Sequence, residues 1–168
     1  MVKPVLELDF WRRRLNKAHA EGRPVHAAIY DCSADHWHRI QIESKVVLAR
    51  HLKAGERILD AGCACGHLFD CLPPGVKYRG IDISPDFIDI ARQRHPRVDF
   101  EVGDLADLRE YRDKCFDWCV VRSVGDMVVE NCGTTKWETI LNELLRVGQR
   151  VLTFEYDNVL ESDKVQSR

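Results

Sequence analysis

The stretch Ile58-Leu59-Asp60-Ala61-Gly62-Cys63-Ala64-Cys65-Gly66-His67-Leu68 decides how this chain should fold. Its apolar start predicts a buried strand over residues 57–60. Gly62 and Gly66 predict a tight turn in which a ligand can approach the backbone closely. The helix expected after Gly66 begins with N–H groups that have no partner inside the helix. The dinucleotide fingerprint needs glycines at relative positions 1, 3 and 6. Those positions hold Gly62, Ala64 and His67, so that fingerprint does not match.

Short apolar runs alternate with helical segments from residue 56 onward. Four further strands are predicted, over residues 76–82, 98–102, 116–121 and 150–155. This alternation predicts an α/β fold with a doubly wound, mostly parallel sheet of about five strands and helices on both faces. In such sheets ligands bind at the carboxyl ends of the strands, where the strand order reverses.

Acidic residues follow two of the predicted strands at these carboxyl ends. Asp82 ends the second strand, 22 residues beyond Asp60 in the chain. An acid at about this distance from a glycine turn can accept hydrogen bonds from ribose hydroxyls. Asp104 follows the third strand, where it can accept from an exocyclic amine such as that of adenine. Gly103-Asp104 is also ordinary turn chemistry. The pattern therefore predicts a nucleoside site without a pyrophosphate site.

The composition fits one cytoplasmic domain. The chain has 168 residues and a net charge of −2, which argues against a domain built mainly to bind nucleic acid. Arg12–Arg14 and Lys17 form a local basic cluster, read as a solvated helix face or a small binding patch. Seven cysteines without a signal peptide or an apolar span predict free thiols in a reducing cytoplasm and no membrane segment. Cys63 and Cys65 have no second closely spaced pair, so no metal site is predicted.

These segments, in this order, resemble the class I S-adenosylmethionine-dependent methyltransferases over roughly residues 30–156. The resemblance implies a Rossmann-like fold and S-adenosylmethionine as cofactor. It implies that the methionine moiety lies against the glycine turn and the ribose against Asp82. The adenine is then expected against Ile83, Asp104 and Leu105, and the sulfonium near Arg122. The cofactor-binding residues predicted in this way are Asp60, Ala61, Gly62, Cys63, Gly66, Asp82, Ile83, Asp104, Leu105, Arg122 and Trp37.

Two departures from the family pattern stand out. Ala64 replaces the middle glycine, which is tolerable at a negative φ and costly at a positive one. The family sheet usually ends with two further strands, and the polar segment after Glu155 cannot supply both. The chain is therefore expected to be a short form that lacks the last strands. Its fifth strand would be a bare edge, covered by the N-terminal helices or by a second copy in a homodimer.

The N-terminal part predicts helices that fold over the cofactor as a lid. A second helix should begin near Asp35 and end before Gly55. Tyr30 and Trp37 could stack near the methyl donor, or Trp37 could belong to the core face of that helix. The predicted division is a lid and substrate segment over 1–55, a cofactor-binding core over 56–157 and a polar tail over 158–168.

The predicted function is methyl transfer to an acceptor that the sequence does not name. The order of preference for the acceptor is a small molecule, a protein side chain and RNA. Asp126, Tyr30 and His36 are the catalytic candidates, and Asp126 could equally cap a turn. The alternative is a non-catalytic S-adenosylmethionine-binding subunit or regulator that acts with a partner. Aminopropyl transfer is disfavoured because the fourth-strand loop carries two acids, Asp126 and Glu130, and no larger acidic cluster.

Overall fold

The chain consists of N-terminal helices followed by an alternating α/β region. The computed structural model describes residues 8–30, 32–154 and 164–165. The helices are α1 (Leu8–Ala20), α2 (His26–Tyr30), α3 (Ala34–His51), the short 3₁₀ helix η1 (Phe69–Cys71), α4 (Pro85–Arg94), α5 (Gly125–Cys132) and α6 (Thr134–Val147). The strands are β1 (Arg57–Ala61), β2 (Lys77–Asp82), β3 (Asp99–Val102), β4 (Phe116–Arg122), β5 (Gly148–Phe154) and β6 (Lys164–Val165).

The six strands form one sheet in the order β3-β2-β1-β4-β5-β6. The first five strands are parallel, and β6 pairs with β5 in the antiparallel direction. Strands β2 and β3 lie on one side of β1, and β4, β5 and β6 lie on the other side. The strand order therefore reverses between β1 and β4, which is where open α/β sheets bind their ligands.

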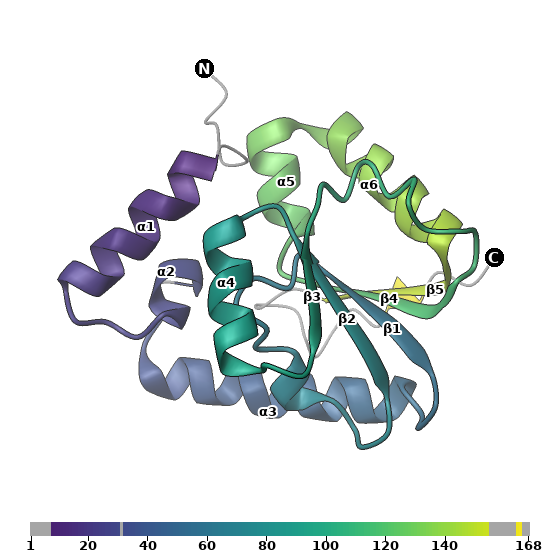
Figure 1. Ribbon diagram of the computed structural model, residues 1–168, viewed down its shortest axis with the longest axis horizontal. Coiled ribbons are helices and arrows are strands. Elements are labelled where there is room, and N and C mark those ends of the chain that lie inside the picture. Colours follow the sequence, from purple (N-terminus) through teal and green to yellow (C-terminus); the bar gives the residue numbers. More distant parts are fainter. Residues whose placement is uncertain (1–7, 31, 155–163, 166–168) are drawn as a thin grey trace.

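Both faces of the sheet are covered, as Figure 1 shows. Side chains alternate along β4: Cys119 and Val121 pack on the side of α6, whereas Trp118 and Val120 pack on the side of α3. This period of two is that of a strand buried on both faces. The strand is therefore apolar along almost its whole length, which is why its sequence reads as a continuous hydrophobic run.

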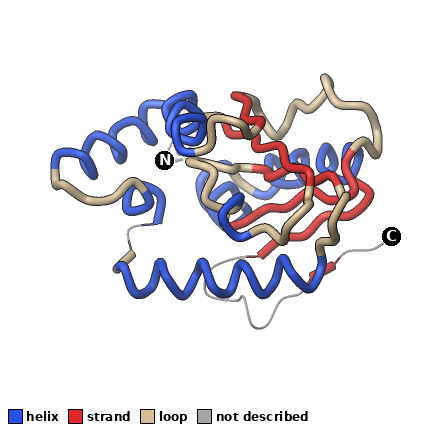
Figure 2. The backbone as a smooth tube through the Cα atoms, turned by 60° about the horizontal axis from the view of Figure 1, so that its bottom comes forward, coloured by secondary structure: helices blue, strands red, loops and turns tan. Residues whose placement is uncertain are grey.

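The N-terminal helices take two different positions. In Figure 2, α3 runs along the sheet, whereas α1 lies to the side of the sheet, away from α3. Helix α3 begins after Ser33, whose Oγ accepts the N–H of His36 at 3.2 Å, and it places Val47 and Leu48 in the core. Helix α1 instead packs Trp11 and Leu15 against residues around the glycine turn. Helix α1 thus lies near the glycine turn, whereas α3 covers part of a sheet face.

The predicted α/β fold is confirmed, and three details are corrected. The helix predicted to begin near Asp35 is α3, which begins at Ala34 and is capped by Ser33. The segment after Gly66 forms a three-residue 3₁₀ helix, because Pro73 and Pro74 follow closely and stop a longer one. The sheet has six strands, because Lys164 and Val165 pair with β5 at Thr153 and Leu152.

The sixth strand changes the argument about the sheet edge. Among the described residues, the segment after Glu155 supplies one short antiparallel strand, β6, of the two further strands in the family pattern. With part of the β5 edge paired, a bare edge no longer argues for a homodimer. Glu155, Tyr156 and most of the predicted tail lie outside the described residues. In the described part of the chain, no helix combines the length and apolar character needed to cross a membrane.

Candidate functional site

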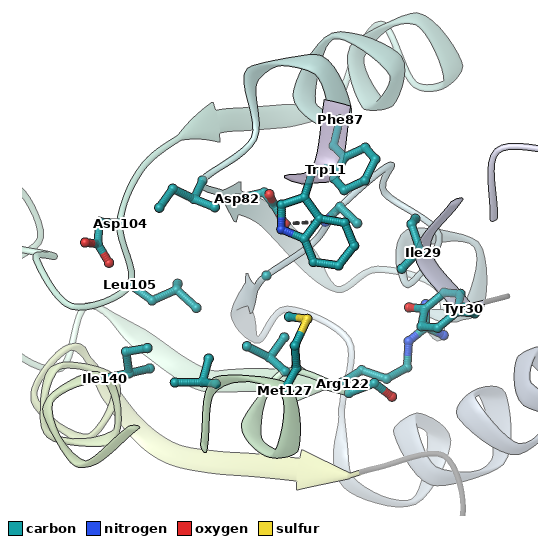
Figure 3. A pocket seen from close by; sticks show the side chains of 16 residues that line it. Trp11, Ile29, Tyr30, Asp82, Phe87, Asp104, Leu105, Arg122, Met127 and Ile140 are labelled. Atoms are coloured by element: carbon teal, nitrogen blue, oxygen red, sulfur yellow. Dashed lines mark hydrogen bonds between the residues drawn. The ribbon is translucent and has the colours of Figure 1, made fainter. Parts of the chain in front are cut away.

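A cleft opens at the carboxyl ends of β1, β2 and β4, beside the point where the strand order reverses. Its empty space amounts to about 800 Å³, a figure that includes the part open to solvent. Figure 3 shows side chains from the sheet loops and from α1 and α2 pointing into it. The lining residues are Trp11, Ile29, Tyr30, Gly62, Ala64, Asp82, Ile83, Phe87, Asp104, Leu105, Arg122, Ser123, Val124, Met127, Val128 and Ile140.

The glycine turn after β1 forms part of the wall and is tightly held. The N–H groups of Gly62 and Cys63 both donate to the carbonyl oxygen of Ile81, at 2.9 and 3.0 Å. Gly62 has a φ of +81°, and a Cβ at this position would lie 2.6 Å from Cγ2 of Val124. Glycine is therefore required here both for its backbone conformation and for space.

Ala64 has a positive φ, which is the costly one of the two conformations considered from the sequence. Its φ is +45°, in the left-handed region that disfavours a residue with a Cβ. Its N–H donates to Oδ2 of Asp82 at 2.9 Å, which ties the turn to the end of β2. Strained positions of this kind gather at functional sites, and Ala64 is one of the residues that line the cleft.

Asp82 has both carboxylate oxygens engaged by the backbone. Oδ1 accepts the N–H of Ser84 at 2.9 Å, and Oδ2 accepts that of Ala64. Burial raises the pKa of Asp82, while the hydrogen bonds from Ser84 and Ala64 act in the opposite direction. A carboxylate offers about four lone-pair positions, so Asp82 keeps accepting capacity towards the cleft.

Asp60 lies behind the cleft wall rather than in it. It is 2% exposed, and its Oδ2 accepts the hydroxyl of Tyr78 at 2.7 Å. Burial raises the pKa of Asp60 to about 7, against the lowering effects of the Tyr78 hydrogen bond and the positive charge of Arg122. The carboxyl group is therefore poised between its neutral and charged forms near neutral pH.

Asp104 lines one end of the cleft and serves two partners. Its Oδ1 accepts the N–H of Ala106 at 2.8 Å, which is the turn chemistry that the sequence allowed. Its Oδ2 lies 3.2 Å from Nζ of Lys136. The carboxylate is partly exposed, so this ion pair is screened by water and can be exchanged for another donor. Leu105 and Ile140 are also labelled at this end of the cleft in Figure 3.

Arg122 and Tyr30 form the opposite end of the cleft, where Figure 3 shows them side by side. The Arg122 side chain is buried, and its Nη1 donates to Oγ of Ser44 at 3.0 Å. Its guanidinium carbon lies 6.0 Å from the ring centres of both Tyr30 and Trp37, within range of a cation–π contact. A positive charge is thus fixed in the cleft wall by α2, α3 and β4 together.

Trp37 supports this end from behind. It stacks on Tyr30 at 5.2 Å and on His26 at 4.6 Å, and it meets His67 edge-on at 4.8 Å. Burial lowers the pKa of His67 to about 2, so this imidazole is neutral at pH 7. Trp37 is therefore half-buried behind the cleft and contacts the lining residue Tyr30.

The structure brings part of the predicted site together. Six of the eleven predicted cofactor residues line the cleft, namely Gly62, Asp82, Ile83, Asp104, Leu105 and Arg122. The other five lie behind the wall: Asp60, Ala61, Cys63, Gly66 and Trp37. Of the three catalytic candidates, Tyr30 lines the cleft and Asp126 and His36 do not. Asp126 is exposed on α5, because the neighbouring Met127 and Val128 are the residues of that helix turned to the cleft.

Several lining residues were not singled out from the sequence. Trp11 is 7% exposed, and its ring lies 5.4 Å from that of Phe87. Ile29 comes from α2, and Met127 from α5. These residues sit on ordinary amphipathic helices, so periodicity assigns them to a core and cannot tell a core from a cleft wall. Ser123 was missed as well, although it follows β4 directly.

The polar and apolar groups that line the cleft are of the kinds that S-adenosylmethionine needs. Asp82 and Asp104 are acceptors for hydroxyl and amine groups, and Ile83 and Leu105 provide apolar surface for a planar base. No group of three or more described His, Cys, Asp or Glu side chains is arranged to hold a metal ion.

Comparisons with known proteins agree with this reading. Residues 58–150 match the family model described as "Methyltransferase domain". The magnesium-protoporphyrin O-methyltransferase of Rhodobacter capsulatus is 42% identical over 59 residues, 32% of this chain and 26% of that protein. The demethylmenaquinone methyltransferase of Chlorobaculum parvum is 36% identical over 73 residues, 40% of this chain and 30% of that protein.

A solved structure extends the likeness to most of the chain. The TehB-like S-adenosylmethionine-dependent methyltransferase of Corynebacterium glutamicum has a TM-score of 0.54 and 25% identity, over 87% of this chain and 71% of that one. The matched segments make up less than a third of the length of the curated relatives. More than half of this chain nevertheless matches the family model. The chain belongs to the methyltransferase domain family, and its fold is that of the class I S-adenosylmethionine-dependent enzymes.

Proposed function

We propose that this chain binds S-adenosylmethionine in the cleft and transfers its methyl group to an acceptor. The observation that carries the proposal is the convergence of Asp82, Asp104 and the glycine turn on one cleft at the strand-order reversal. Asp82 lines the cleft with both carboxylate oxygens already held by backbone N–H groups, so its remaining lone pairs are positioned to accept from a ligand. Membership of the methyltransferase domain family supports the same reading.

In this proposal, different lining residues bind different parts of the cofactor. Asp82 would accept the ribose hydroxyls, while Asp104 would accept the adenine amine in place of Lys136. Ile83 and Leu105 would hold the base between apolar surfaces, and the Gly62 turn would lie against the methionine moiety. When bound, S-adenosylmethionine supplies an electrophilic methyl group, so the protein mainly has to align the acceptor and exclude water. Alignment of this kind can contribute about 7–11 kcal/mol to lowering a barrier.

The acceptor in this proposal is a small molecule. Trp11 and Ile29 bring α1 and α2 over the cleft, which leaves a partly enclosed space rather than a flat surface. The curated relatives that match include O-methyltransferases named for magnesium-protoporphyrin and for malonyl-[acyl-carrier protein]. We also propose a reducing, cytoplasmic location, which is supported by seven cysteines that are all free thiols.

Isothermal titration with S-adenosylmethionine and S-adenosylhomocysteine tests the proposal. Binding of both compounds is the expected result, and no binding of either would refute it. A turnover assay with labelled methyl donor against metabolites and peptides then separates an enzyme from a non-catalytic binding subunit. Binding without turnover on any acceptor, alone or with a partner protein, would favour the subunit.

A further inference from the structure

The cleft wall contains few groups that could remove a proton from an acceptor. Among the described lining residues, the ionisable side chains are Asp82, Asp104, Tyr30 and Arg122. The first two are assigned to adenosine in the function proposed above, on which this inference rests. Amines, alcohols and phenols reach a methyl donor protonated and usually need a base, whereas a carboxylate arrives already ionised.

The Arg122 end of the cleft has the charge that an ionised acceptor needs. Its guanidinium is held by Ser44 and by the faces of Tyr30 and Trp37, and the side chain is 7% exposed. Water screens charges weakly at such a buried position, so an anion beside Arg122 is attracted more strongly than at the surface. A guanidinium also presents its donors in a fork that matches the two oxygens of a carboxylate.

Ser123 adds a second, independent feature at the same end. Its φ is +56°, an unfavourable value for a residue with a Cβ, and its N–H is anchored on the carbonyl oxygen of Phe154 at 3.0 Å. Its Oγ is buried and has no hydrogen-bond partner among the described residues, although Ser123 lines the cleft. A buried hydroxyl without a partner is costly, and strained backbone gathers at functional sites. A ligand oxygen would satisfy this hydroxyl.

We infer that Arg122 and Ser123, with Tyr30 beside them, form a subsite for the carboxylate of the methyl acceptor. The acceptor is then a carboxylic acid whose hydrocarbon part lies against the neighbouring apolar residues Ile29 and Met127. The product is a methyl ester. The step forms a bond between a carboxylate oxygen and the methyl carbon and breaks the bond between that carbon and sulfur. The electron pair of the broken bond stays on sulfur, and no proton moves.

Small carboxylates and their amides test this subsite without knowledge of the natural acceptor. Protein saturated with S-adenosylhomocysteine is titrated with benzoate against benzamide, and with hexanoate against hexanamide, followed by protein-observed NMR. At least one carboxylate should bind tenfold or more tightly than its amide. Equal affinities in both pairs would overturn the inference, while the function proposed above would fail separately if S-adenosylhomocysteine did not bind.

Variants locate the preference at Arg122 and Ser123. Arg122→Gln should reduce the preference for the carboxylate to less than threefold, and Ser123→Ala should weaken carboxylate binding about threefold. Arg109→Gln removes an exposed arginine elsewhere and should leave the preference unchanged. If Arg122→Gln does not fold, Arg122→Lys and Ser123→Ala are used instead. Arg122→Lys keeps the positive charge but loses the paired donors of the guanidinium, so it should also reduce the preference for the carboxylate. An undiminished preference in the folded variants would overturn the assignment.

A second arm separates the acceptor's carboxylate from that of the cofactor. S-adenosylhomocysteine carries an α-carboxylate, and 5′-methylthioadenosine does not. If Arg122 serves the acceptor, Arg122→Gln should change the affinities for the two compounds by similar factors. A tenfold loss confined to S-adenosylhomocysteine would place the cofactor's carboxylate at Arg122 and overturn the inference.

Discussion

The two ends of the cleft are built in different ways. At one end, Asp82 is the last residue of β2 and Asp104 follows the neighbouring parallel strand β3. Each accepts a backbone N–H of its own loop, and Asp82 also accepts the N–H of Ala64 in the glycine turn. At the other end, Arg122 is fixed by Ser44 of α3 and by the rings of Tyr30 and Trp37. The acidic end therefore depends on local turns, whereas the basic end depends on the docking of helices that precede the sheet in the chain.

This difference matters for function. Loops fixed by their own backbone can keep one shape in many relatives and recognise a common ligand. An end assembled from separate elements can vary with each of them and set specificity. In the proposed function, the acidic end binds the shared adenosine moiety and the basic end selects the acceptor.

Asp60, which lies between the two ends, should give the largest effect. Its pKa is raised from 3.8 to about 7 in the folded protein, so the folded state holds this proton more tightly than the unfolded chain does. The free energy of unfolding should fall as the pH rises from about 4 to about 7, by up to about 4 kcal/mol. Asp60→Asn should remove this slope and be the more stable protein at pH 8.

Chemical denaturation of both proteins at pH 4.5 and pH 8 measures this slope. Asp107→Asn, which removes an exposed carboxylate, is the control and should not abolish the slope. The same fall in stability for wild type and Asp60→Asn would show that another group causes it.

Trp11 tests whether α1 is docked on the cleft. Trp11 is 7% exposed and packs against Phe87, so Trp11→Ala should lower the free energy of unfolding by about 3 kcal/mol. Trp11→Phe keeps an aromatic ring and should cost clearly less. Urea titrations of the two variants provide the comparison, and a loss of less than 1 kcal/mol in Trp11→Ala would mean that α1 contributes little to this wall.

Asp82 tests the acidic end directly. Asp82→Ala should lower the affinity for S-adenosylhomocysteine at least tenfold, or about 1.4 kcal/mol, because the ribose loses its acceptor. Asp89→Ala, on the exposed side of α4, should bind normally. Isothermal titration checks both variants, and an unchanged affinity in Asp82→Ala would show that the ribose assignment is wrong.

Ala64 should give the smallest effect. Replacing it by glycine relieves a left-handed conformation worth about 1–2 kcal/mol, partly offset by the greater freedom of glycine in the unfolded chain. Ala64→Gly should therefore be more stable by less than about 1 kcal/mol. Ala91→Gly, in the buried middle of α4, should change stability in the opposite direction. Destabilisation by Ala64→Gly in thermal unfolding would mean that the methyl contact outweighs the strain.

The sequence alone was enough to predict the α/β architecture, the order of the five parallel strands along the chain and the position of the acidic end. Each of these features depends on neighbours in the chain: apolar runs of strand length, a glycine turn, and an acid at the end of a strand. The spacing of Asp82 from the glycine turn likewise predicts a nucleoside site from the chain alone.

The tertiary structure alone decided the rest of the site. Trp11, Ile29 and Ser44 reach the cleft or its supports from helices whose docking depends on long-range packing, which periodicity does not specify. Asp126 lies outside the cleft because helix α5 turns Met127 and Val128 towards it. The sequence also did not predict the positive φ of Ala64 and Ser123 or the pairing of β6 with β5. The whole fold imposes these features on residues that would not adopt them in isolation.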